Sequence, residues 1–327
     1  MDGDILISVV VPNYNGAKYI KDTVNSVLNQ SYNFWEMIIV DDGSTDESEH
    51  VVQHFHDNRI RFYRRGGDYP KGANACRNIG IKKASGDYLI FLDSDDLLSV
   101  NCLKNRLDYL KQHPNLLFAV FPSIKFSENP SDGKVFTRLL GVNPVNHFFC
   151  TDNLWQTSSV IWRRDFVLSI NGYNIAYQRL QDPEMTLRAL IAAKGNFGLS
   201  HESIPDIYYR RPLIQGPAKL LASYKAMFQF INDFYIDQNL IYINSHNTLV
   251  MFYHLSNLHL ECCHNLQDKN DYLLCAKKLI HYNSGIQYSI IFFVCKYKIL
   301  FNHLRYWKPF RVIFSRYVSY YKKKNLV

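Results

Sequence analysis

The sequence predicts an α/β fold built on a mostly parallel β-sheet, followed by a helical extension. Three short apolar runs, at residues 7–11, 37–40 and 88–92, are rich in β-branched and aromatic residues. Such runs are typical of strands buried on both faces of a sheet. Between the first two runs, apolar residues recur at helical spacing over residues 17–30. This alternation of strands and helices favours parallel strands.

Polar and acidic residues follow each of the three predicted strands. Strand ends of this kind face the crevice in which open α/β sheets bind ligands. Clustered carboxylates repel one another unless a bound cation neutralises them, and oxygen ligands suit Mg²⁺ or Mn²⁺. We therefore expect a divalent metal and a nucleoside diphosphate at this edge. The residues concerned are Pro12-Asn13-Tyr14-Asn15, Asp41-Asp42 and Asp93-Ser94-Asp95.

Each acidic motif also has a purely structural interpretation. Asp-Gly-Ser after a strand is a common turn, and Asp-Ser-Asp-Asp can cap a helix that starts near Leu97. Capping does not require carboxylates to cluster on consecutive strands, so the ordered set favours ligand binding.

Several motifs follow one another in a fixed order over residues 7–212. They are Val9–Asn15, Ile38–Asp46, Gly72–Gly80, Asp93–Asp95, Thr157–Val160, Arg163–Asp165, Gly172-Tyr173 and Gln181–Arg188. This order resembles the family 2 glycosyltransferases, inverting nucleotide-sugar enzymes of the GT-A fold, and Asp93-Ser94-Asp95 matches the family's D-x-D element.

The resemblance implies roles for residues of the first three motifs and of the D-x-D element. Pro12, Tyr14 and Asp42 would surround the nucleobase, with Tyr14 stacking and Asp42 accepting a hydrogen bond from a ring N–H of uracil or thymine. Asp95 would bind Mn²⁺ or Mg²⁺ directly. The other residues implied to bind the nucleotide sugar are Asp41, Arg77, Asp93 and Ser94. For Arg77, a surface salt bridge is the alternative to nucleotide binding.

Asp182 is the expected general base. An inverting transfer is a direct displacement, so a base must take the proton of the acceptor hydroxyl. Asp182 occupies the aspartate of the family's Glu-Asp pair, although Gln181 stands where Glu is usual, and Glu184 is the alternative base. Because Pro183 suits the first helical position, Asp182 also has the structural interpretation of a helix N-cap.

Three further residues are candidate contacts for the acceptor or the phosphates. Arg210 and Arg211 resemble the family's Tyr-Arg element and would help hold the phosphates; a solvated pair is the alternative. Trp155 lies where an acceptor sugar could stack, and burial in the core is its alternative.

The 327 residues are predicted to form a catalytic domain, residues 1–215, and a helical extension, residues 216–327. Residues 272–327 contain eleven Lys or Arg and no Asp or Glu, with aromatic residues interleaved. This pattern is typical of an amphipathic helix on an anionic membrane surface. Packing of the tail on the catalytic domain is a second interpretation. Nucleic acid is not expected as a partner, because no recognised binding motif accompanies the basic residues.

The remaining motifs restrict the function class and the compartment. No G-x-G-x-x-G turn, P-loop or Q-x-x-R-W element occurs, which argues against dinucleotide oxidoreductases, P-loop enzymes and processive synthases. The seven cysteines include no C-x-x-C pair and are expected to be reduced, and the amino terminus does not match a signal peptide. We expect a cytoplasmic protein, peripheral on the inner face of the cytoplasmic membrane.

Together these features predict transfer of a single sugar from a UDP-sugar or similar donor. The resemblance implies a glycan or polyprenyl-diphosphate-linked acceptor and a role in bacterial surface polysaccharide assembly, such as O-antigen, capsule or lipooligosaccharide. The alternative is a catalytically degenerate, membrane-tethered nucleotide-binding or scaffolding protein, which retention of Asp95 and Asp182 disfavours.

Overall fold

The computed structural model describes residues 5–137, 139, 143–149, 151, 153–200, 203–211 and 217–236. The chain forms two compact units, Met1–Leu140 with Asn153–Leu213 and Gly141–Asp152 with Ile214–Val327. The first unit ends near the predicted boundary at residue 215, while residues 141–152 group with the second unit. The predicted amphipathic tail, residues 272–327, lies outside the described residues.

A seven-stranded sheet forms the core of the first unit, in the order β10-β6-β9-β4-β1-β2-β3. Strands β4, β1, β2 and β3 are parallel neighbours, whereas β9 runs antiparallel to both β4 and β6. The prediction of an α/β fold with a mostly parallel sheet is confirmed. The strands are β1 (Ile7–Asn13), β2 (Trp35–Asp41), β3 (Ile60–Arg64), β4 (Tyr88–Phe91), β6 (Phe118–Val120), β9 (Val160–Arg163) and β10 (Phe197–Leu199).

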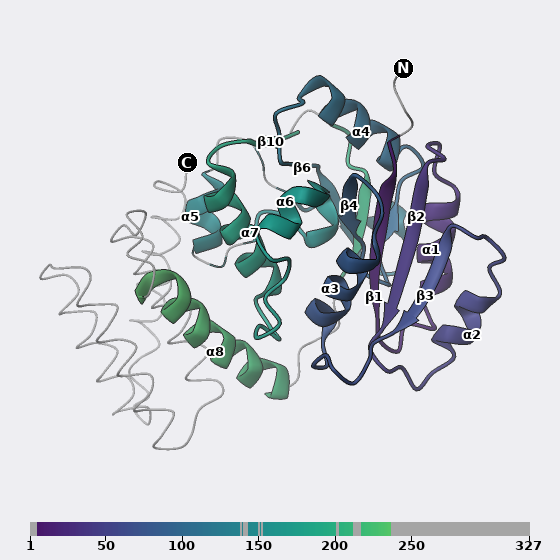
Figure 1. The fold of residues 1–327 in the computed structure, drawn as a ribbon, viewed down its shortest axis with the longest axis horizontal. Helices are drawn as coiled ribbons and strands as arrows, with labels where there is room; N and C mark the ends of the chain where they lie inside the picture. Colours follow the sequence, from purple (N-terminus) through teal and green to yellow (C-terminus); the bar gives the residue numbers. More distant parts are fainter. Residues whose placement is uncertain are drawn as a thin grey trace, which may run out of the picture. The chain divides into compact units, whose positions relative to one another are not determined.

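Helices cover both faces of this sheet, as alternation along β1 requires. Val9 and Val11 pack in the cluster that includes Ile20 and Val24 of α1, whereas Val10 faces Gly80 of α3. In Figure 1, α3 accordingly lies in front of β1. The helices of the first unit are α1 (Ile20–Leu28), α2 (Ser48–Gln53), α3 (Ala73–Lys83), α4 (Cys102–Gln112), α6 (Arg164–Ser169), α7 (Gln181–Ala193) and the 3₁₀ turns η1 (Pro130–Asp132) and η2 (Thr157–Ser159).

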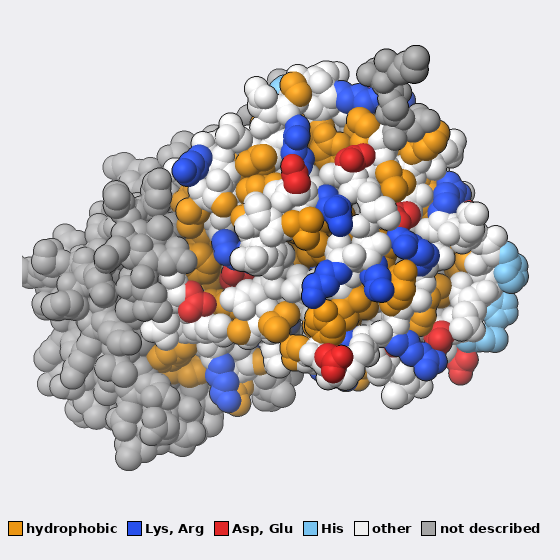
Figure 2. Space-filling view, viewed as in Figure 1, with side chains coloured by type: hydrophobic (Ala, Val, Ile, Leu, Met, Phe, Trp, Pro, Cys, Tyr) orange, Lys and Arg blue, Asp and Glu red, His pale blue; other side chains and the backbone are white. Residues whose placement is uncertain are grey.

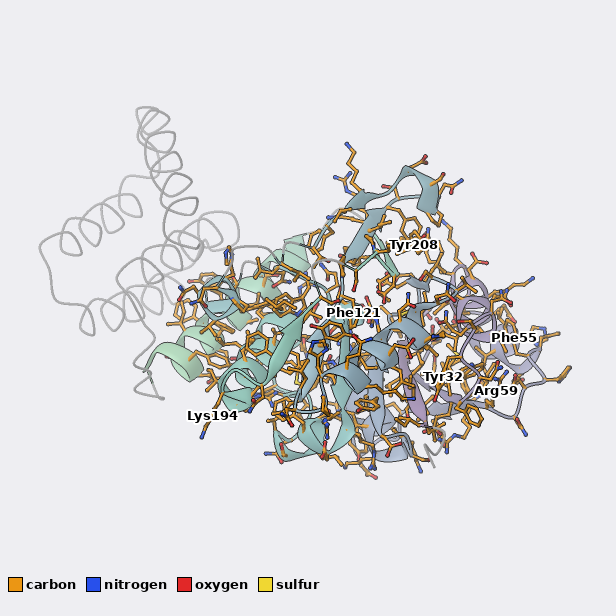
Figure 3. The ribbon with its side chains drawn as sticks, turned by 90° about the horizontal axis from the view of Figure 1, so that it is seen from above. Tyr32, Phe55, Arg59, Phe121, Lys194 and Tyr208 are labelled. Atoms are coloured by element: carbon orange, nitrogen blue, oxygen red, sulfur yellow. The ribbon has the colours of Figure 1, made fainter. Side chains whose placement is uncertain are left out.

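A second, smaller sheet is attached to the first unit, with the strand order β5-β11-β7-β8. Its strands are β5 (Leu97–Leu98), β7 (Ser123–Phe126), β8 (Lys134–Val135) and β11 (Ile207–Arg210). In Figure 3 the small sheet can be found from the label of Tyr208, which belongs to β11. The label lies near the part of the ribbon that projects beyond the large sheet. The helix expected to start near Leu97 is wrong, because Leu97 and Leu98 pair with β11 and α4 begins only at Cys102.

The second unit is described only in part, by α5 (Pro144–Phe149), α8 (Pro217–Ile231) and the π-helical turn η3 (Asn232–Ile236). The residues Tyr224, Met227, Phe230 and Phe234 recur at helical spacing here and are buried. Within the described ranges, no helix is both long and apolar enough to cross a bilayer.

Charged side chains of the first unit are not segregated on the face that Figure 2 shows. Lys, Arg, Asp and Glu side chains are scattered there among hydrophobic ones over the described residues. Of the seven cysteines, Cys76 and Cys102 are described, and both are buried free thiols. Burial raises the pKa of Cys76 to about 12, so this thiol is unreactive at neutral pH.

Substituting Gly80 by Ala should destabilise the protein by about 1–3 kcal/mol. A Cβ at residue 80 would lie 2.2 Å from Val10 Cγ1, so α3 would have to move away from β1. Gly67→Ala is the matched control, because nothing lies within 4 Å of its added Cβ. Urea unfolding of the two variants measures the difference, and equal midpoints would contradict the close contact of α3 with β1.

Candidate active site

The loop after β2 is organised by Asp41. Its carboxylate accepts hydrogen bonds from Asn13 Nδ2 at 2.8 Å, from the Gly43 N–H at 3.0 Å and from the Ser44 N–H at 2.8 Å. Asn13 ends β1 and Asp41 ends β2, and the two residues are register partners. Asp41 therefore supports the loop by joining two neighbouring strand ends.

Asp42 and Tyr14 lie on the same edge with different exposure. The Asp42 carboxylate is buried and accepts hydrogen bonds from Arg65 Nε at 2.5 Å and from the Gly72 N–H at 2.9 Å. Tyr14 is 48% exposed, and Lys71 Nζ lies 3.9 Å from its ring centroid. An exposed ring is available for stacking, whereas Asp42 would recognise a base with its remaining lone pairs.

Arg77 is an internal connector. The residue is only 3% exposed; Nη2 donates to Asp93 Oδ1 at 2.7 Å and Nη1 donates to Gln181 Oε1 at 2.9 Å. Its predicted alternative as a surface salt bridge is wrong, since the guanidinium is buried. The Asp93 charge raises the pKa of Arg77 despite the opposing effect of burial. Arg77 thus connects the D-x-D element to the start of α7. Gln181, which stands where the family usually has Glu, accepts a hydrogen bond from the same guanidinium that binds Asp93.

Asp95 and Asp96 have raised pKa values because each is shielded from water, Asp96 fully and Asp95 in part, and lies near another carboxylate. Burial, with the charge of Asp93 added, raises the pKa of Asp95 to about 6. Burial also raises the pKa of Asp96, whose oxygens accept from Ser158 Oγ at 3.0 Å and from the Arg210 N–H at 2.9 Å. Asp95 is the half-buried member of this pair and remains accessible to a ligand.

Asp182 lies in the first turn of α7 and is held by η2. The Thr157 hydroxyl and backbone N–H both hydrogen bond to its carboxylate, and Thr157 Oγ1 also lies 2.9 Å from the Tyr173 hydroxyl. Burial raises the pKa of Asp182; Arg77 opposes this shift and Asp93 adds to it. The N-cap of α7 is Leu180, so the interpretation of Asp182 as the N-cap is wrong.

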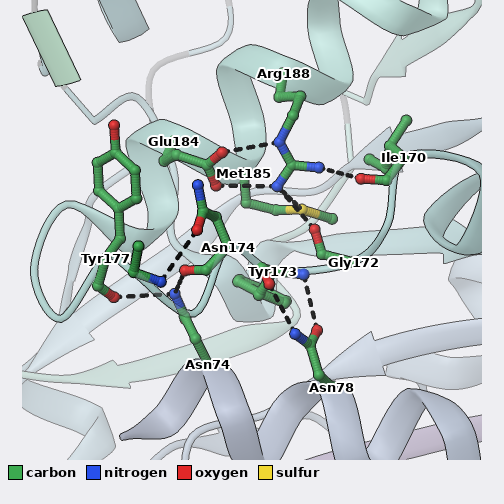
Figure 4. A network of polar contacts seen from close by, with 11 residues as sticks. Asn74, Asn78, Ile170, Gly172, Tyr173, Asn174, Tyr177, Glu184, Met185 and Arg188 are labelled. Carbon is green, nitrogen blue, oxygen red and sulfur yellow. Dashed lines mark hydrogen bonds and ion pairs between the residues drawn. The ribbon is translucent and has the colours of Figure 1, made fainter. Parts of the chain in front are cut away.

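The loop before α7 is fastened by amide and guanidinium groups (Figure 4). Asn74 Nδ2 donates to the carbonyls of Asn174 and Tyr177, at 2.8 and 3.1 Å. Glu184 is buried and paired with Arg188, whose Nη2 also donates to the Gly172 carbonyl at 2.8 Å. Because Glu184 is engaged in this network, Asp182 is favoured over it as the base.

The other predicted site residues differ in how far they are buried. Arg210 is buried, with Nε donating to the Asp95 carbonyl at 3.1 Å, while Arg211 is exposed. Trp155 is 1% exposed, so its expected role as a stacking surface for a sugar is wrong and the core alternative holds. Pro12 is buried in β1, and Ser94 is half-buried, with its carbonyl accepting from Thr23 Oγ1 at 2.9 Å.

Three residues near the carboxylates were missed as site residues. Thr157 holds Asp182, Asp96 joins η2 to β11, and the pKa of Tyr209 is raised by burial and by surrounding carboxylates, those of Asp96, Asp93, Asp182 and Asp95. Thr157 and Tyr209 do belong to motifs that the family resemblance includes, so that resemblance was the available signal.

Comparison with known proteins agrees with this geometry. The family model described as Glycosyl transferase family 2 matches residues 8–167. This chain contains a family 2 glycosyltransferase domain. The structure of TarS from S. aureus in complex with UDP-GlcNAc is similar, with a TM-score of 0.61 at 18% identity, covering 84% of this chain and 80% of that one. The fold of the glycosyltransferase domain is therefore GT-A.

Curated relatives match a shorter segment. The proposed teichuronic acid biosynthesis glycosyltransferase TuaG of Bacillus subtilis (strain 168) is 41% identical over 107 residues, 33% of this chain and 42% of TuaG. The Escherichia coli protein WfgD, named as a UDP-Glc:alpha-D-GlcNAc-diphosphoundecaprenol beta-1,3-glucosyltransferase, is 38% identical over 107 residues, 33% of this chain and 42% of WfgD. The matched segments thus span less than half of these relatives.

The site fits a divalent cation that is shared with a diphosphate. Within the described residues, no group of three or more His, Cys, Asp or Glu side chains could hold a metal by itself. Mg²⁺ and similar cations are often bound by one or two carboxylates together with substrate phosphates. The half-buried Asp95, whose ionised form is disfavoured without a nearby cation, suits that arrangement.

Binding of Mn²⁺ with UDP should weaken at acidic pH. A metal held by Asp95 would need the ionised carboxylate, whose pKa is raised to about 6, so protonation would compete with binding below that pH. We expect the apparent affinity to fall about tenfold per pH unit below about 6. Calorimetric titrations between about pH 5 and 8 measure this slope.

Two variants separate the effect from general acid damage. Asp95→Asn should lose most Mn²⁺-dependent UDP binding at every pH, whereas Asp108→Asn, which changes an exposed residue paired with Lys104, should keep the wild-type profile. An affinity of the wild type that does not change with pH would contradict the role of Asp95.

Proposed function

We propose that this protein is an inverting glycosyltransferase that transfers a single sugar from a UDP-sugar, or a similar nucleotide sugar, to an acceptor hydroxyl. The observation that carries the proposal is the grouping of Asp182, Asp93 and Arg77, with Asp95 in the same D-x-D element. Asp182 and Asp95 are both half-buried, so each presents part of its surface to a ligand. Asp182, at the start of α7, suits a general base, and Asp95 suits a cation.

Each group has a defined part in the proposed reaction. Asp182 accepts the proton of the acceptor hydroxyl as that oxygen attacks the anomeric carbon, and the nucleoside diphosphate leaves from the opposite side. Thr157 orients the base through its hydroxyl and N–H, and Arg77 fixes Asp93. A divalent cation bound by Asp95 would neutralise charge on the leaving diphosphate. Arg210, bonded to the Asp95 carbonyl, supports the D-x-D loop.

The proposed acceptor is a glycan or polyprenyl-diphosphate-linked sugar used in bacterial surface polysaccharide assembly. The names of two relatives support this class, since TuaG is assigned to teichuronic acid biosynthesis and WfgD to a lipid-linked acceptor. A position on the inner face of the cytoplasmic membrane follows from such an acceptor, and the basic aromatic residues of 272–327 fit an anionic surface.

A thermal-shift panel with UDP, dTDP, GDP and CMP, each with and without Mn²⁺, tests the donor class. We expect one nucleotide to stabilise the wild type in a metal-dependent way, because bound ligand stabilises the folded state by mass action. Asp95→Ala should abolish the metal-dependent part, and Asp108→Ala should retain it. No response to any nucleotide would contradict the proposal.

A further inference from the structure

One face of the small sheet carries a lysine and two aromatic side chains. Lys125 of β7 and Tyr209 of β11 are register partners, and Phe136 directly follows β8. The ring centroids of Phe136 and Tyr209 are 5.9 Å apart, with planes inclined at 48°. Lys125 Nζ lies 5.5 Å from the Phe136 centroid and 5.8 Å from that of Tyr209. We name Lys125, Phe136 and Tyr209 the Lys125 cluster.

The Lys125 cluster is accessible and carries uncompensated positive charge. All three side chains are half-buried, so each presents part of its surface to solvent. Over the described ranges, no carboxylate forms an ion pair with Lys125. Lys134, its register partner in β8, is exposed and adds a second positive charge. An anion approaching this face therefore meets an ammonium group that is not neutralised.

The cluster also borders the candidate active site. Arg210, the residue after Tyr209, donates its N–H to Asp96 Oδ1 at 2.9 Å. The carboxylates of Asp96, Asp93, Asp182 and Asp95 lie near enough to the Tyr209 phenol to interact with it electrostatically. Tyr209 therefore has both these carboxylates and Lys125 as neighbours. A ligand bound on the cluster would lie beside the base that deprotonates the acceptor.

Main-chain and side-chain hydrogen bonds hold the segment that carries Phe136 of the Lys125 cluster in place. The Phe136 N–H donates to the Ser123 carbonyl at 2.9 Å, and the Ser123 N–H donates to Thr137 Oγ1 at 2.8 Å. These bonds hold residues 136 and 137 against β7. A preordered pair of rings loses little conformational entropy when it binds a ligand.

The chemistry of the cluster matches a phosphorylated sugar. Aromatic faces pack against the C–H surface of a sugar ring, and a lysine ammonium binds phosphate as a point charge. A phosphate beside several carboxylates would be repelled, and the positive charge of Lys125 would offset this repulsion. The donor diphosphate has its own candidate site at Asp95, so we assign the anion at Lys125 to a second molecule.

We propose that the Lys125 cluster binds the acceptor and that this acceptor is a glycosyl diphosphate, with its sugar ring on Tyr209 and Phe136 and its phosphate at Lys125. This inference rests on the proposed transferase function, selects the diphosphate-linked acceptor and assigns it a binding site. The sugar hydroxyl that is glycosylated then points toward Asp182.

Binding of soluble acceptor probes to the full chain tests the assignment, with UDP and Mn²⁺ present. The probes are short-chain alkyl diphosphate esters of glucose, galactose and N-acetylglucosamine, each compared with the alkyl glycoside that lacks phosphate. We expect at least one ester to bind about tenfold or more tightly than its glycoside, as a charge-assisted hydrogen bond would produce. Lys125→Gln should remove most of that preference, and Lys125→Arg should keep it.

Two control variants separate the charge of Lys125 from the rings beside it and from lysines elsewhere on the surface. Lys111→Gln removes an exposed lysine of α4 and should leave the preference unchanged. Tyr209→Leu should weaken esters and glycosides together, since it removes the ring and not the charge. Equal binding of ester and glycoside, failure of every ester to bind, or a preference retained in Lys125→Gln would each overturn the proposal.

Failure of this inference and failure of the proposed function give different results. If the chain binds no nucleotide, the transferase proposal fails at the donor, whatever the acceptor probes do. If UDP binds with Mn²⁺ but the esters show no dependence on Lys125, only the acceptor subsite fails. A loss of UDP affinity in Lys125→Gln would assign the lysine to the donor and also overturn the inference.

Discussion

Changing Asp182 to Asn should lower the rate of sugar transfer by about 10²–10⁴-fold, because general-base catalysis contributes that much. Asn is nearly isosteric with Asp and can still accept from the Thr157 hydroxyl and N–H, so η2 and α7 should keep their geometry. Nucleotide binding should remain close to wild type, since the donor contacts proposed here lie on the D-x-D element and the β1 and β2 loops. Turnover of donor and acceptor, with the UDP affinity of the same sample, measures both effects.

Glu184→Gln is the matched control for that variant. Glu184 is the other acidic residue of the first turn of α7, but it is buried against Arg188. Its amide should lower the stability of the protein and leave the turnover of the folded fraction far less affected than Asp182→Asn does. Comparable rate losses in the two variants, or an unchanged rate in Asp182→Asn, would remove Asp182 from the mechanism.

The pH dependence of turnover should also report Asp182 as the general base. Burial raises the pKa of Asp182 above its ordinary value of 3.8, Arg77 opposes this, and Asp93 adds to it. A base must be ionised, so turnover should fall as the pH is lowered through this raised pKa. The acidic limb of the wild-type profile should therefore lie above pH 3.8, and it should be absent from the residual rate of Asp182→Asn.

The sequence was sufficient for the parts of the fold that depend on local patterns. The apolar runs that become β1, β2 and β4 are continuous because those strands are buried on both faces, and their acidic ends come together because parallel strands end at one edge. The helix α1 and the apolar spacing of α8 follow from the same kind of pattern.

Contacts between residues far apart in the sequence could not be predicted from such local patterns. The antiparallel β9, the role of Arg77 between Asp93 and Gln181, and the burial of Trp155 depend on segments far apart in sequence. A buried arginine looks like an exposed one until its acceptors are known, and a tryptophan next to a motif can pack inward or outward. Tyr209 was overlooked for the same reason, because its neighbours come from the D-x-D element and from α7.

A second large effect is expected at the ion pair of Arg106 and Asp206, which joins α4 to the segment before β11. Arg106 is 0% and Asp206 3% exposed in their side chains, and two hydrogen bonds link them, at 2.8 and 2.7 Å. Asp206→Ala would leave the guanidinium buried without its counter-ion. Breaking one side of a buried pair costs about 3–5 kcal/mol, so the unfolding midpoint in urea should fall strongly.

The control for this substitution is Asp108→Ala. Asp108 pairs with Lys104 at 2.5 Å, but both side chains are about half exposed, and surface pairs contribute at most about 1 kcal/mol. Comparable losses in the two variants would show that burial of the Arg106 pair is not what makes it important. The double variant Arg106→Leu/Asp206→Leu, which removes both charges, should recover part of the stability lost in Asp206→Ala.

Recovery of stability by the double variant should not restore activity. Arg106 Nη1 also donates to the Ser158 carbonyl at 2.9 Å, and Ser158 Oγ donates to Asp96, while the adjacent Thr157 holds Asp182. Replacing Arg106 by Leu releases η2 even where the core refolds around it, and a misplacement of about 1 Å at a catalytic group can cost about 100-fold in rate. Full activity in a stable double variant would mean that η2 positions Asp182 without Arg106.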